Sequence, residues 1–195
     1  MKYICYYNQE KIYISAIKDS MVYEFELNYK TYPNIPKINY LEFEYADLII
    51  KKINKNISRF KGISNFFGHE IIIASDDDFT DNEKQALLEK FINTGFKNVY
   101  LMEKSKLYKT ETDRNCISMY SNERNCIISK IDDNKVLEKE IISKYNKEKI
   151  DTVLKSFQNR QVIMKVYGDD SMYCDSVIQI KEVMENMKRI YANNN

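Results

Sequence analysis

A strand–helix–strand pattern in the first half of the chain constrains the fold more than any other feature. Residues 71–74 form a short, wholly apolar run, which is typical of a strand buried on both faces. Thr80 followed by Glu83 is a capping-box pattern, and residues 86–92 then carry apolar side chains at helical spacing. Residues 98–102 resume as a strand. The order predicts a parallel βαβ unit and therefore an α/β fold.

Two similar groups of strands lie before and after this pattern. The expected strands cover residues 2–7, 11–17 and 21–27, and again residues 115–118, 125–131 and 136–142. Beyond them we expect helices over residues 42–57, 147–158 and 181–191, and strands over residues 161–167 and 177–180. The chain thus divides into two expected domains, residues 1–110 and 111–195, each opening with a three-strand meander.

The central segments also resemble one protein family. They read IIIA at residues 71–74, FTDNEK at residues 79–84 and GFKNVYLME at residues 95–103. This succession resembles the bacterial rod-shape actins, the MreB branch of the actin, sugar kinase and Hsp70 superfamily. There a buried strand leads to a helix opening Thr-x-x-Glu-Arg, and a small-residue turn precedes a strand ending Leu-Ile-Glu-Glu-Pro. Here the Glu-Pro step is replaced by Glu103-Lys104.

The resemblance implies a degenerate actin-like (ribonuclease H-like) fold with two small lobes, each a mixed sheet flanked by helices. Residues 1–110 would be lobe I, with subdomain IB nearly deleted. Residues 111–195 would be a reduced lobe II, and the chain ends before the family's adenosine-binding segment.

The two phosphate-binding hairpins of the family depart from their pattern in this sequence. An actin-type ATPase needs an Asp-x-Gly turn at each, because the carboxylate organises the water shell of the metal and glycine lets backbone amides approach phosphates. By the register of the resemblance, Cys5 and Tyr7 replace Asp and Gly in the first hairpin. Ser118 replaces the Asp of the second, and residues 120–122 replace its glycine run. We therefore expect no nucleotide, no other cofactor and no catalysis.

Two other residues have catalytic and structural interpretations. Glu83 matches a glutamate that orients the attacking water in MreB-type proteins, but a capping-box role explains it without the phosphate hairpins. His69 is the only histidine, so no Ser–His, Cys–His or multi-histidine metal site can be assembled from a pair. We expect it at a loop or strand end.

Asp76, Asp77 and Asp78 form the densest acidic cluster and follow the expected buried strand. Ligands gather at the carboxyl ends of strands in open α/β sheets, so a Mg²⁺ or Ca²⁺ site is one interpretation. A docking site for a basic partner is a second. A third is purely structural, because acidic residues complement the positive end of the following helix dipole. We retain the partner-binding role and predict no metal.

Tyrosine is unusually frequent, with 16 residues in the chain. Tyrosine provides large contact areas in protein interfaces at low entropy cost. Tyr29, Tyr32, Tyr40 and Tyr45 gather around a proline-containing loop at the truncated subdomain. We expect them, with Asp76–Asp78, to contact a partner protein.

Composition limits the classes of partner. The formal net charge is +1, so no overall field favours nucleic acid or a membrane surface. The basic residues around Lys51-Lys52 are explained by a solvated helix face. The four cysteines contain no CxxC motif, so neither zinc nor a disulfide framework is indicated. The sequence has no signal-peptide pattern and no apolar run near the ~18 residues of a membrane span, so we expect a cytoplasmic protein.

These features predict a non-catalytic protein-binding module on a decayed actin-like scaffold. Stoichiometric neutralisation of a partner, as by an immunity protein that occludes a toxin, is the leading hypothesis. The alternative is a regulator or capping partner of an actin-like (MreB) filament. An enzyme with an unrecognised site is the least favoured, because histidine partners, phosphate hairpins and cysteine motifs are missing.

Overall fold

The structure is a computed structural model of the 195-residue chain. It describes residues 1–8, 11–18, 20–26, 69–93, 96–122, 124–143, 146–158, 164–169 and 171–193. The predicted helix over residues 42–57 and the tyrosines Tyr29, Tyr32, Tyr40 and Tyr45 lie outside these ranges.

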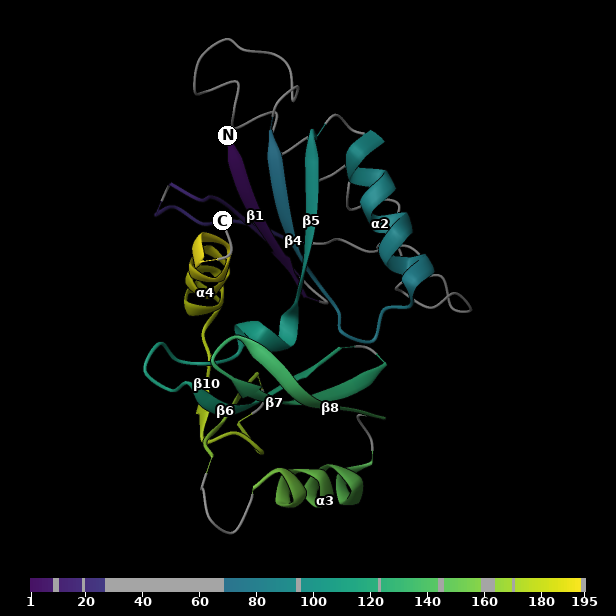
Figure 1. Cartoon of the computed structure of the whole chain (residues 1–195), viewed down its shortest axis with the longest axis vertical. Coiled ribbons are helices and arrows are strands. Elements are labelled where there is room, and N and C mark those ends of the chain that lie inside the picture. The colour runs from purple at the N-terminus through teal and green to yellow at the C-terminus, as the bar shows by residue number, and fades with distance from the viewer. Residues whose placement is uncertain are drawn as a thin grey trace. The chain divides into compact units, whose positions relative to one another are not determined.

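The described residues form ten strands, three α-helices and one 3₁₀ helix (Figure 1). The strands are β1 (Lys2–Tyr7), β2 (Lys11–Ala16), β3 (Tyr23–Glu26), β4 (Glu70–Ser75), β5 (Asn98–Glu103), β6 (Asn115–Ser121), β7 (Asn125–Asp132), β8 (Lys135–Ser143), β9 (Val166–Gly168) and β10 (Ser176–Val177). The helices are α2 (Asp81–Asn93), the 3₁₀ helix η2 (Lys104–Leu107), α3 (Lys147–Phe157) and α4 (Ile180–Asn193).

The chain divides into two compact units. The first comprises Met1–Ile73 and Phe79–Leu101, and the second comprises Ala74–Asp78 and Met102–Asn195. The sequence placed the domain boundary at residue 110, whereas the second unit begins at Met102 and also takes in Ala74–Asp78. The difference arises because the side chains of residues 76–78 bond to residues that follow β5 in the chain.

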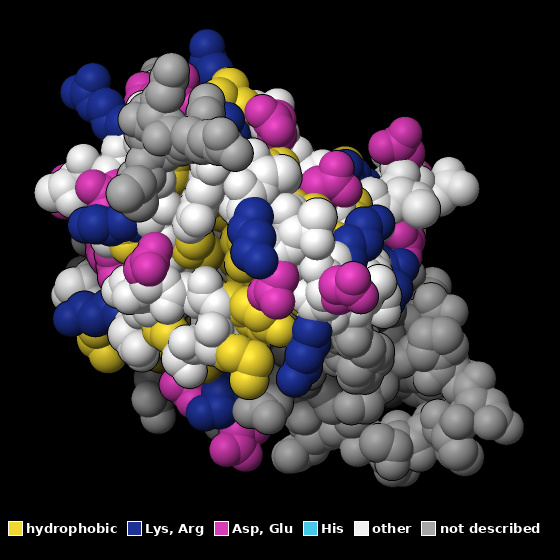
Figure 2. Space-filling view, turned by 90° about the horizontal axis from the view of Figure 1, so that it is seen from below, with side chains coloured by type: hydrophobic (Ala, Val, Ile, Leu, Met, Phe, Trp, Pro, Cys, Tyr) yellow, Lys and Arg dark blue, Asp and Glu magenta, His cyan; other side chains and the backbone are white. Residues whose placement is uncertain are grey.

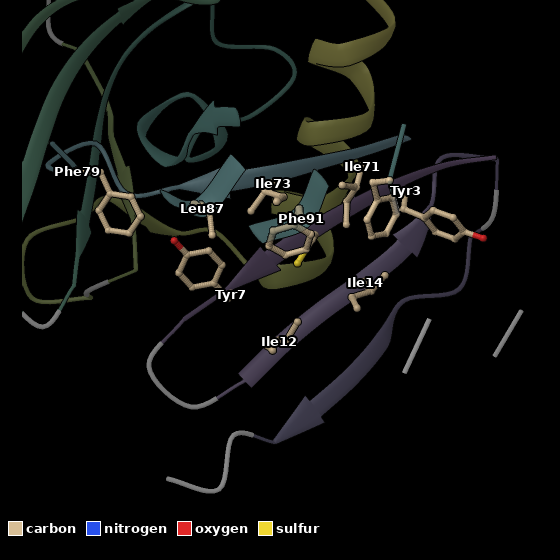
Figure 3. Packing of buried hydrophobic residues seen from close by; sticks show 11 residues of the cluster. Tyr3, Tyr7, Ile12, Ile14, Ile71, Ile73, Phe79, Leu87 and Phe91 are labelled. Atoms are coloured by element: carbon tan, nitrogen blue, oxygen red, sulfur yellow. The ribbon is translucent and has the colours of Figure 1, made fainter. Parts of the chain in front are cut away.

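The first unit is built on a sheet with strand order β3-β2-β1-β4-β5. Strand β1 pairs antiparallel with β2 and parallel with β4, so the sheet is mixed. One face packs against α2 through a cluster in which Tyr7, Leu87 and Phe91 lie close together (Figure 3). The central strands are buried on the other face as well, since Ile4 and Ile72 are at most 1% exposed. This burial explains why residues 71–74 read as a continuous apolar run.

Helix α2 begins where the capping box predicted. The Thr80 backbone amide donates to Glu83 Oε2 at 2.7 Å, and the Glu83 amide donates to Thr80 Oγ1 at 3.2 Å. This reciprocal pair satisfies donors that the first helical turn leaves without intrahelical partners. The predicted structural role of Glu83 is confirmed.

The second unit is built on a sheet with strand order β10-β9-β6-β7-β8. Strands β6, β7 and β8 form an antiparallel meander, and β9 pairs parallel with β6. One face carries a core that includes Ile117, Ile128 and Phe157, the last contributed by α3. The β7–β8 turn has a positive φ of 55° at Asp133.

Sequence patterning predicted most described elements to within a few residues, but two features differ. The strand expected over residues 161–167 is described only as Val166–Gly168. The 3₁₀ helix Lys104–Leu107 was not predicted, and it buries both Lys104 and Ser105. All four cysteines are free thiols, and all but Cys174 are buried. Among the described residues, no helix is long and apolar enough to cross a membrane.

Candidate functional site

The three consecutive aspartates lie directly after β4, within the second unit. Asp76 and Asp77 are each 6% exposed, and the Asp78 side chain is 4% exposed. Burying a carboxylate is costly unless hydrogen bonds or opposite charges compensate it. The partners of the three side chains therefore decide what the cluster can do.

Asp77 is held by a set of donors from three elements. The backbone amide of Ser105 donates to Asp77 Oδ2 at 3.0 Å, and the Ser105 hydroxyl donates to Oδ1. The Tyr120 hydroxyl donates to Asp77 Oδ2 and accepts from the Asp77 backbone amide, each at 2.8 Å. Lys139 on β8 places its ammonium 3.5 Å from Asp77 Oδ1 and 3.2 Å from Glu103 Oε1. These bonds tie the residues after β4 to η2, β6 and β8.

Asp76 forms a buried ion pair. Lys104 Nζ donates to Asp76 Oδ1 at 2.9 Å, and the two side chains are 4% and 9% exposed. Burial raises the pKa of the Asp76 carboxyl, and the Lys104 ammonium only partly offsets this effect. Nearby, burial would raise the pKa of Glu103, but the ammonium groups of Lys106 and Lys139 outweigh burial and lower it.

Asp78 binds the β6–β7 hairpin. The side-chain amides of Asn122 and Asn125 donate to its two oxygens at 2.9 and 2.8 Å. The Arg124 guanidinium adds an ion pair, with Nε 3.5 Å from Asp78 Oδ2. The three aspartates thus use their carboxylates within the second unit.

The contacts of Asp76, Asp77 and Asp78 can be compared with the metal-binding, partner-binding and structural interpretations of this cluster. Among the described residues, no group of three or more His, Cys, Asp or Glu side chains is arranged to hold a metal ion. The carboxylates engage protein donors rather than facing solvent, so the structure gives them an internal role. Binding of a partner by Asp76–Asp78 or by the four tyrosines stays a prediction.

Each of the two hairpins implicated by the resemblance is closed by an asparagine. In the first, the Asn8 amide donates to the Lys11 carbonyl at 3.0 Å, and the Lys11 amide donates to Asn8 Oδ1 at 2.9 Å. In the second, Asn122 and Asn125 make the same pair of bonds, at 2.9 and 2.8 Å. The described residues of the two turns therefore share this pair of hydrogen bonds, in agreement with the two similar groups of strands expected from the sequence.

The residues that the resemblance aligns with the family's Asp and Gly are buried. Cys5 and Ser118 are 0% exposed, and Tyr7 and Tyr120 are 8% and 1% exposed. The Tyr120 ring stacks on Tyr108, with centroids 5.6 Å apart and planes 8° apart. These positions carry core side chains.

Backbone amides of the second hairpin are also occupied. The Ser121 amide donates to both carboxylate oxygens of Asp169, at 3.0 and 3.2 Å. The Arg124 amide donates to Asn122 Oδ1 at 2.9 Å. Side chains of the protein therefore fill the acceptor role that a bound anion would otherwise take at these amides.

Sequence reasoning missed Lys104, Ser105 and Asp169. The sequence shows Lys104 where the MreB pattern has proline. It does not show that Lys104 donates a hydrogen bond to Asp76, 28 residues earlier. Asp169 lies 48 residues after Ser121, and no local pattern links the two.

Comparisons with known proteins agree with the fold. No protein-family model and no curated protein sequence matches the chain. Among solved structures, MreB5 of Spiroplasma citri bound to AMPPNP matches with a TM-score of 0.51 and 12% identity, over 82% of this chain and 57% of that one. The same protein bound to ADP matches with a TM-score of 0.50 and 13% identity, with the same coverage. This chain thus spans little more than half the length of MreB5.

A shorter protein matches along nearly its whole length. The cytoplasmic domain of EpsL, an inner-membrane component of the type II secretion system of Vibrio cholerae, matches with a TM-score of 0.50 and 6% identity. The match covers 97% of this chain and 94% of that domain. At these identities the likeness concerns architecture alone. The chain has an α/β, actin-like (ribonuclease H-like) fold with two five-stranded mixed sheets.

Proposed function

We propose that this chain is a non-catalytic, cytoplasmic protein-binding module on a decayed actin-like scaffold. Its proposed action is stoichiometric neutralisation of a partner protein, of the toxin–immunity type. We also assign the scaffold to the MreB branch, because residues 71–103 follow the strand, capped helix and strand pattern of that branch.

The observation that carries the proposal is that backbone amides of the second hairpin already donate to side chains of the protein itself. Its Ser121 amide is bound by Asp169, and its Arg124 and Asn125 amides are bound by the Asn122 side chain. Tyr120 fills the core beside them and bonds to Asp77. A phosphate at this turn would have to displace these acceptors, so the geometry favours a role that does not use a nucleotide.

The extent of the EpsL match supports a role in protein assembly. A domain with this fold, aligned over 94% of its length, belongs to an inner-membrane component of a type II secretion system. A scaffold of about this size is therefore compatible with a protein whose work is to bind other proteins. The toxin–immunity assignment itself rests on the composition of the chain and on the elimination of the catalytic classes.

The surface is suited to local recognition. On the face seen in Figure 2, acidic and basic side chains are interspersed, and hydrophobic side chains are exposed among them. A mixed surface of this kind confers specificity through the pattern of its charges. We expect a 1:1 complex whose energy is concentrated in a few contacts.

Affinity capture from the lysate of the native host, followed by mass spectrometry, tests the proposal together with a thermal-shift measurement in Mg-ATP. We expect one partner at 1:1 stoichiometry and no shift of the melting temperature with Mg-ATP. The captured partner should then be purified and the stoichiometry confirmed by analytical ultracentrifugation.

A clear stabilisation by Mg-ATP would contradict the proposal, because a ligand that binds only the folded state stabilises it by RT ln(1 + [L]/Kd), about 2.7 kcal/mol at 100 times Kd. Mg-AMPPNP serves as the matched ligand, because it resembles Mg-ATP but cannot be hydrolysed to release phosphate in the same way. A shift with both would indicate binding, and phosphate release with ATP alone would indicate an ATPase.

The second candidate is a regulator or capping partner of an MreB filament. It is favoured by the MreB-like pattern of residues 71–103 and the match of 82% of the chain to MreB5. Co-sedimentation with polymerised MreB tests it directly. If an amount of this protein well below that of MreB reduces the pelleted polymer, the result would indicate capping. The genes beside this one give a further separation, since a toxin gene supports neutralisation and a cell-shape operon supports the filament role.

A further inference from the structure

Strand β8 forms one edge of the second sheet and is the longest strand among the described residues (Figure 1). It has nine residues and pairs with β7 on one side. No other described strand pairs with its second side. An edge strand presents main-chain N–H and C=O groups that can bond to a further extended chain.

The regular part of this edge begins after a bulge. Lys130 lies opposite Glu138 but Ile131 lies opposite Val136, so Leu137 is the extra residue on β8. A bulge disrupts the ladder and bends the strand locally, so it limits pairing at that point. From Glu138 to Ser143 the register with β7 is unbroken. Six residues therefore remain as a regular edge.

Side chains on the regular edge alternate in chemistry. Glu140 and Ile142 lie opposite Ile128 and Cys126, which belong to the core that α3 covers. Glu138 shares that face, because strand side chains alternate with a period of two. Ile141 lies on the other face and is 42% exposed, and the bulged Leu137 is 55% exposed. An acidic row and exposed apolar groups thus flank one edge.

The charge of this edge is not balanced within the described residues. Lys139 is directed to Glu103 and Asp77, so its ammonium is already paired. Glu138 has one ion pair, to Lys130 at 3.6 Å, and its side chain is 58% exposed. Glu140 is exposed, and no ion pair to it occurs in the described part of the chain. The acidic row is therefore available to positive side chains.

We propose that β8 is the docking edge for an extended segment of a partner protein, which adds to the sheet as a further strand. The segment carries Lys or Arg facing Glu138 and Glu140, and an apolar residue facing Ile141. Main-chain hydrogen bonds provide affinity in such strand addition, and alternate side chains provide specificity. The inference rests on the proposed protein-binding function and locates its surface.

In three antiparallel registers, a second copy of this chain fits the edge less well than a basic partner. An antiparallel pair centred on Lys139 places Lys139 opposite itself and Glu138 opposite Glu140. Pairs centred on Glu138 or on Glu140 place that glutamate opposite its own copy. Like charges directly opposite each other destabilise a strand pair. The sequence of β8 thus opposes self-association in these registers and favours a chain of opposite charge.

The test uses the full-length protein and a fluorescein-labelled peptide of eight alternating Lys and Val residues. A peptide of alternating Glu and Val is the charge-reversed probe. We expect saturable binding of the Lys–Val peptide by fluorescence anisotropy and none of the Glu–Val peptide. Hydrogen exchange measured by mass spectrometry should slow over residues 138–143 when the Lys–Val peptide binds.

Variants locate the binding. Glu138→Lys combined with Glu140→Lys should weaken the Lys–Val peptide about tenfold or more, because two close charge pairs become repulsive. Glu148→Lys combined with Asp151→Lys makes the same change of charge on exposed positions of α3 and should alter Kd less than about twofold, as expected for charges outside the contact. Circular dichroism and thermal melts must show that both variants fold.

Four results would overturn the inference. Equal weakening by both variants would mean that the peptide responds to overall charge. Exchange protection outside residues 138–143 would place the site elsewhere. A concentration-dependent dimer that Ile141→Lys abolishes would show that a second copy occupies the edge.

The partner captured from lysate separates this inference from the proposed function. If that partner still binds the Glu138→Lys/Glu140→Lys protein, the docking edge is wrong although the proposed function stands. If the wild-type protein captures no partner and Mg-ATP stabilises it, the proposed function fails.

Discussion

Tyr120 and Asp77 hold each other through two hydrogen bonds that share one hydroxyl. The Tyr120 hydroxyl donates to Asp77 Oδ2 and accepts from the Asp77 amide, each at 2.8 Å. The Tyr120 side chain is 1% exposed, and Asp77 follows a different strand, 43 residues earlier in the chain. The pair therefore connects the residues after β4 with the second hairpin.

Tyr120→Phe should lower the free energy of unfolding by about 1–3 kcal/mol. The change keeps the ring stacked on Tyr108 but leaves a buried amide and a buried carboxylate each short of a partner. Urea unfolding followed by circular dichroism measures the loss. Tyr100→Phe, at a residue that is 42% exposed, is the control and should change stability by less than about 0.5 kcal/mol. Equal losses in the two variants would contradict the assigned role of the Tyr120 hydroxyl.

The Asp76–Lys104 ion pair gives a prediction that depends on pH. Lys104→Met leaves the Asp76 carboxylate buried without its cation, which should cost about 3–5 kcal/mol at neutral pH. Burial already raises the pKa of Asp76, and loss of the ammonium raises it further. As the pH falls through this raised pKa, the folded state takes up a proton before the unfolded state does. The loss should therefore be larger at pH 8 than at pH 5.

Unfolding by urea across this pH range tests the direction. The double variant Asp76→Asn/Lys104→Met is the control, since it has no carboxyl to titrate at this position. Its stability relative to wild type should lack the recovery at low pH that the single variant shows. A single variant that loses more stability at pH 5 than at pH 8 would refute the assignment.

Gly168 allows β9 to approach β6 closely. A Cβ atom at this position would lie 2.0 Å from the Met119 carbonyl oxygen and 2.7 Å from Cys174 Sγ. Gly168→Ala must therefore displace backbone, and we expect a loss of at least the roughly 1–3 kcal/mol typical of overpacking. The melting temperature reports it. Ser176→Ala, on the exposed strand β10, should leave the melting temperature nearly unchanged.

The cysteines should differ in reactivity toward iodoacetamide. Cys174 is partly exposed, whereas Cys5, Cys116 and Cys126 are buried. Burial also raises the pKa of the Cys116 thiol to about 11, which keeps it protonated at pH 8 and unreactive. Intact-mass measurement should show one adduct in the native protein and four in urea. Early modification of Cys116 would mean that the second sheet opens readily.

Local patterns were sufficient to predict the strands of the first sheet and the helix α2, although not the order of the strands. The run at residues 71–74 became β4 because a strand with both faces buried contains only apolar side chains. The capping box predicted the start of α2 because its bonds join residues three apart in the chain. The likeness to actin-type proteins was also visible in this stretch. Each of these inferences needs only neighbours in the sequence.

The role of the acidic cluster depended on distant parts of the chain. Asp76 and Asp77 receive their bonds from residues 28 and 43 positions away, and Asp78 from residues 44 and 47 positions away. The local sequence around a carboxylate at a strand end does not distinguish whether that carboxylate binds a cation, a partner protein or a donor within the same chain. Only the folded chain brings Lys104, Ser105 and Tyr120 to it.

The sequence by itself determined the α/β class, the two strand meanders and the absence of an Asp-x-Gly motif from residues 2–17 and 115–132, because periodicity, capping and residue identity act over a few positions. The tertiary structure decided that the aspartates bind donors of the second unit, that Asp169 accepts from an amide of the second hairpin and that β8 lies at a sheet edge. Strand order and the pairing of buried polar groups arise from contacts between distant segments, and no local pattern encodes them.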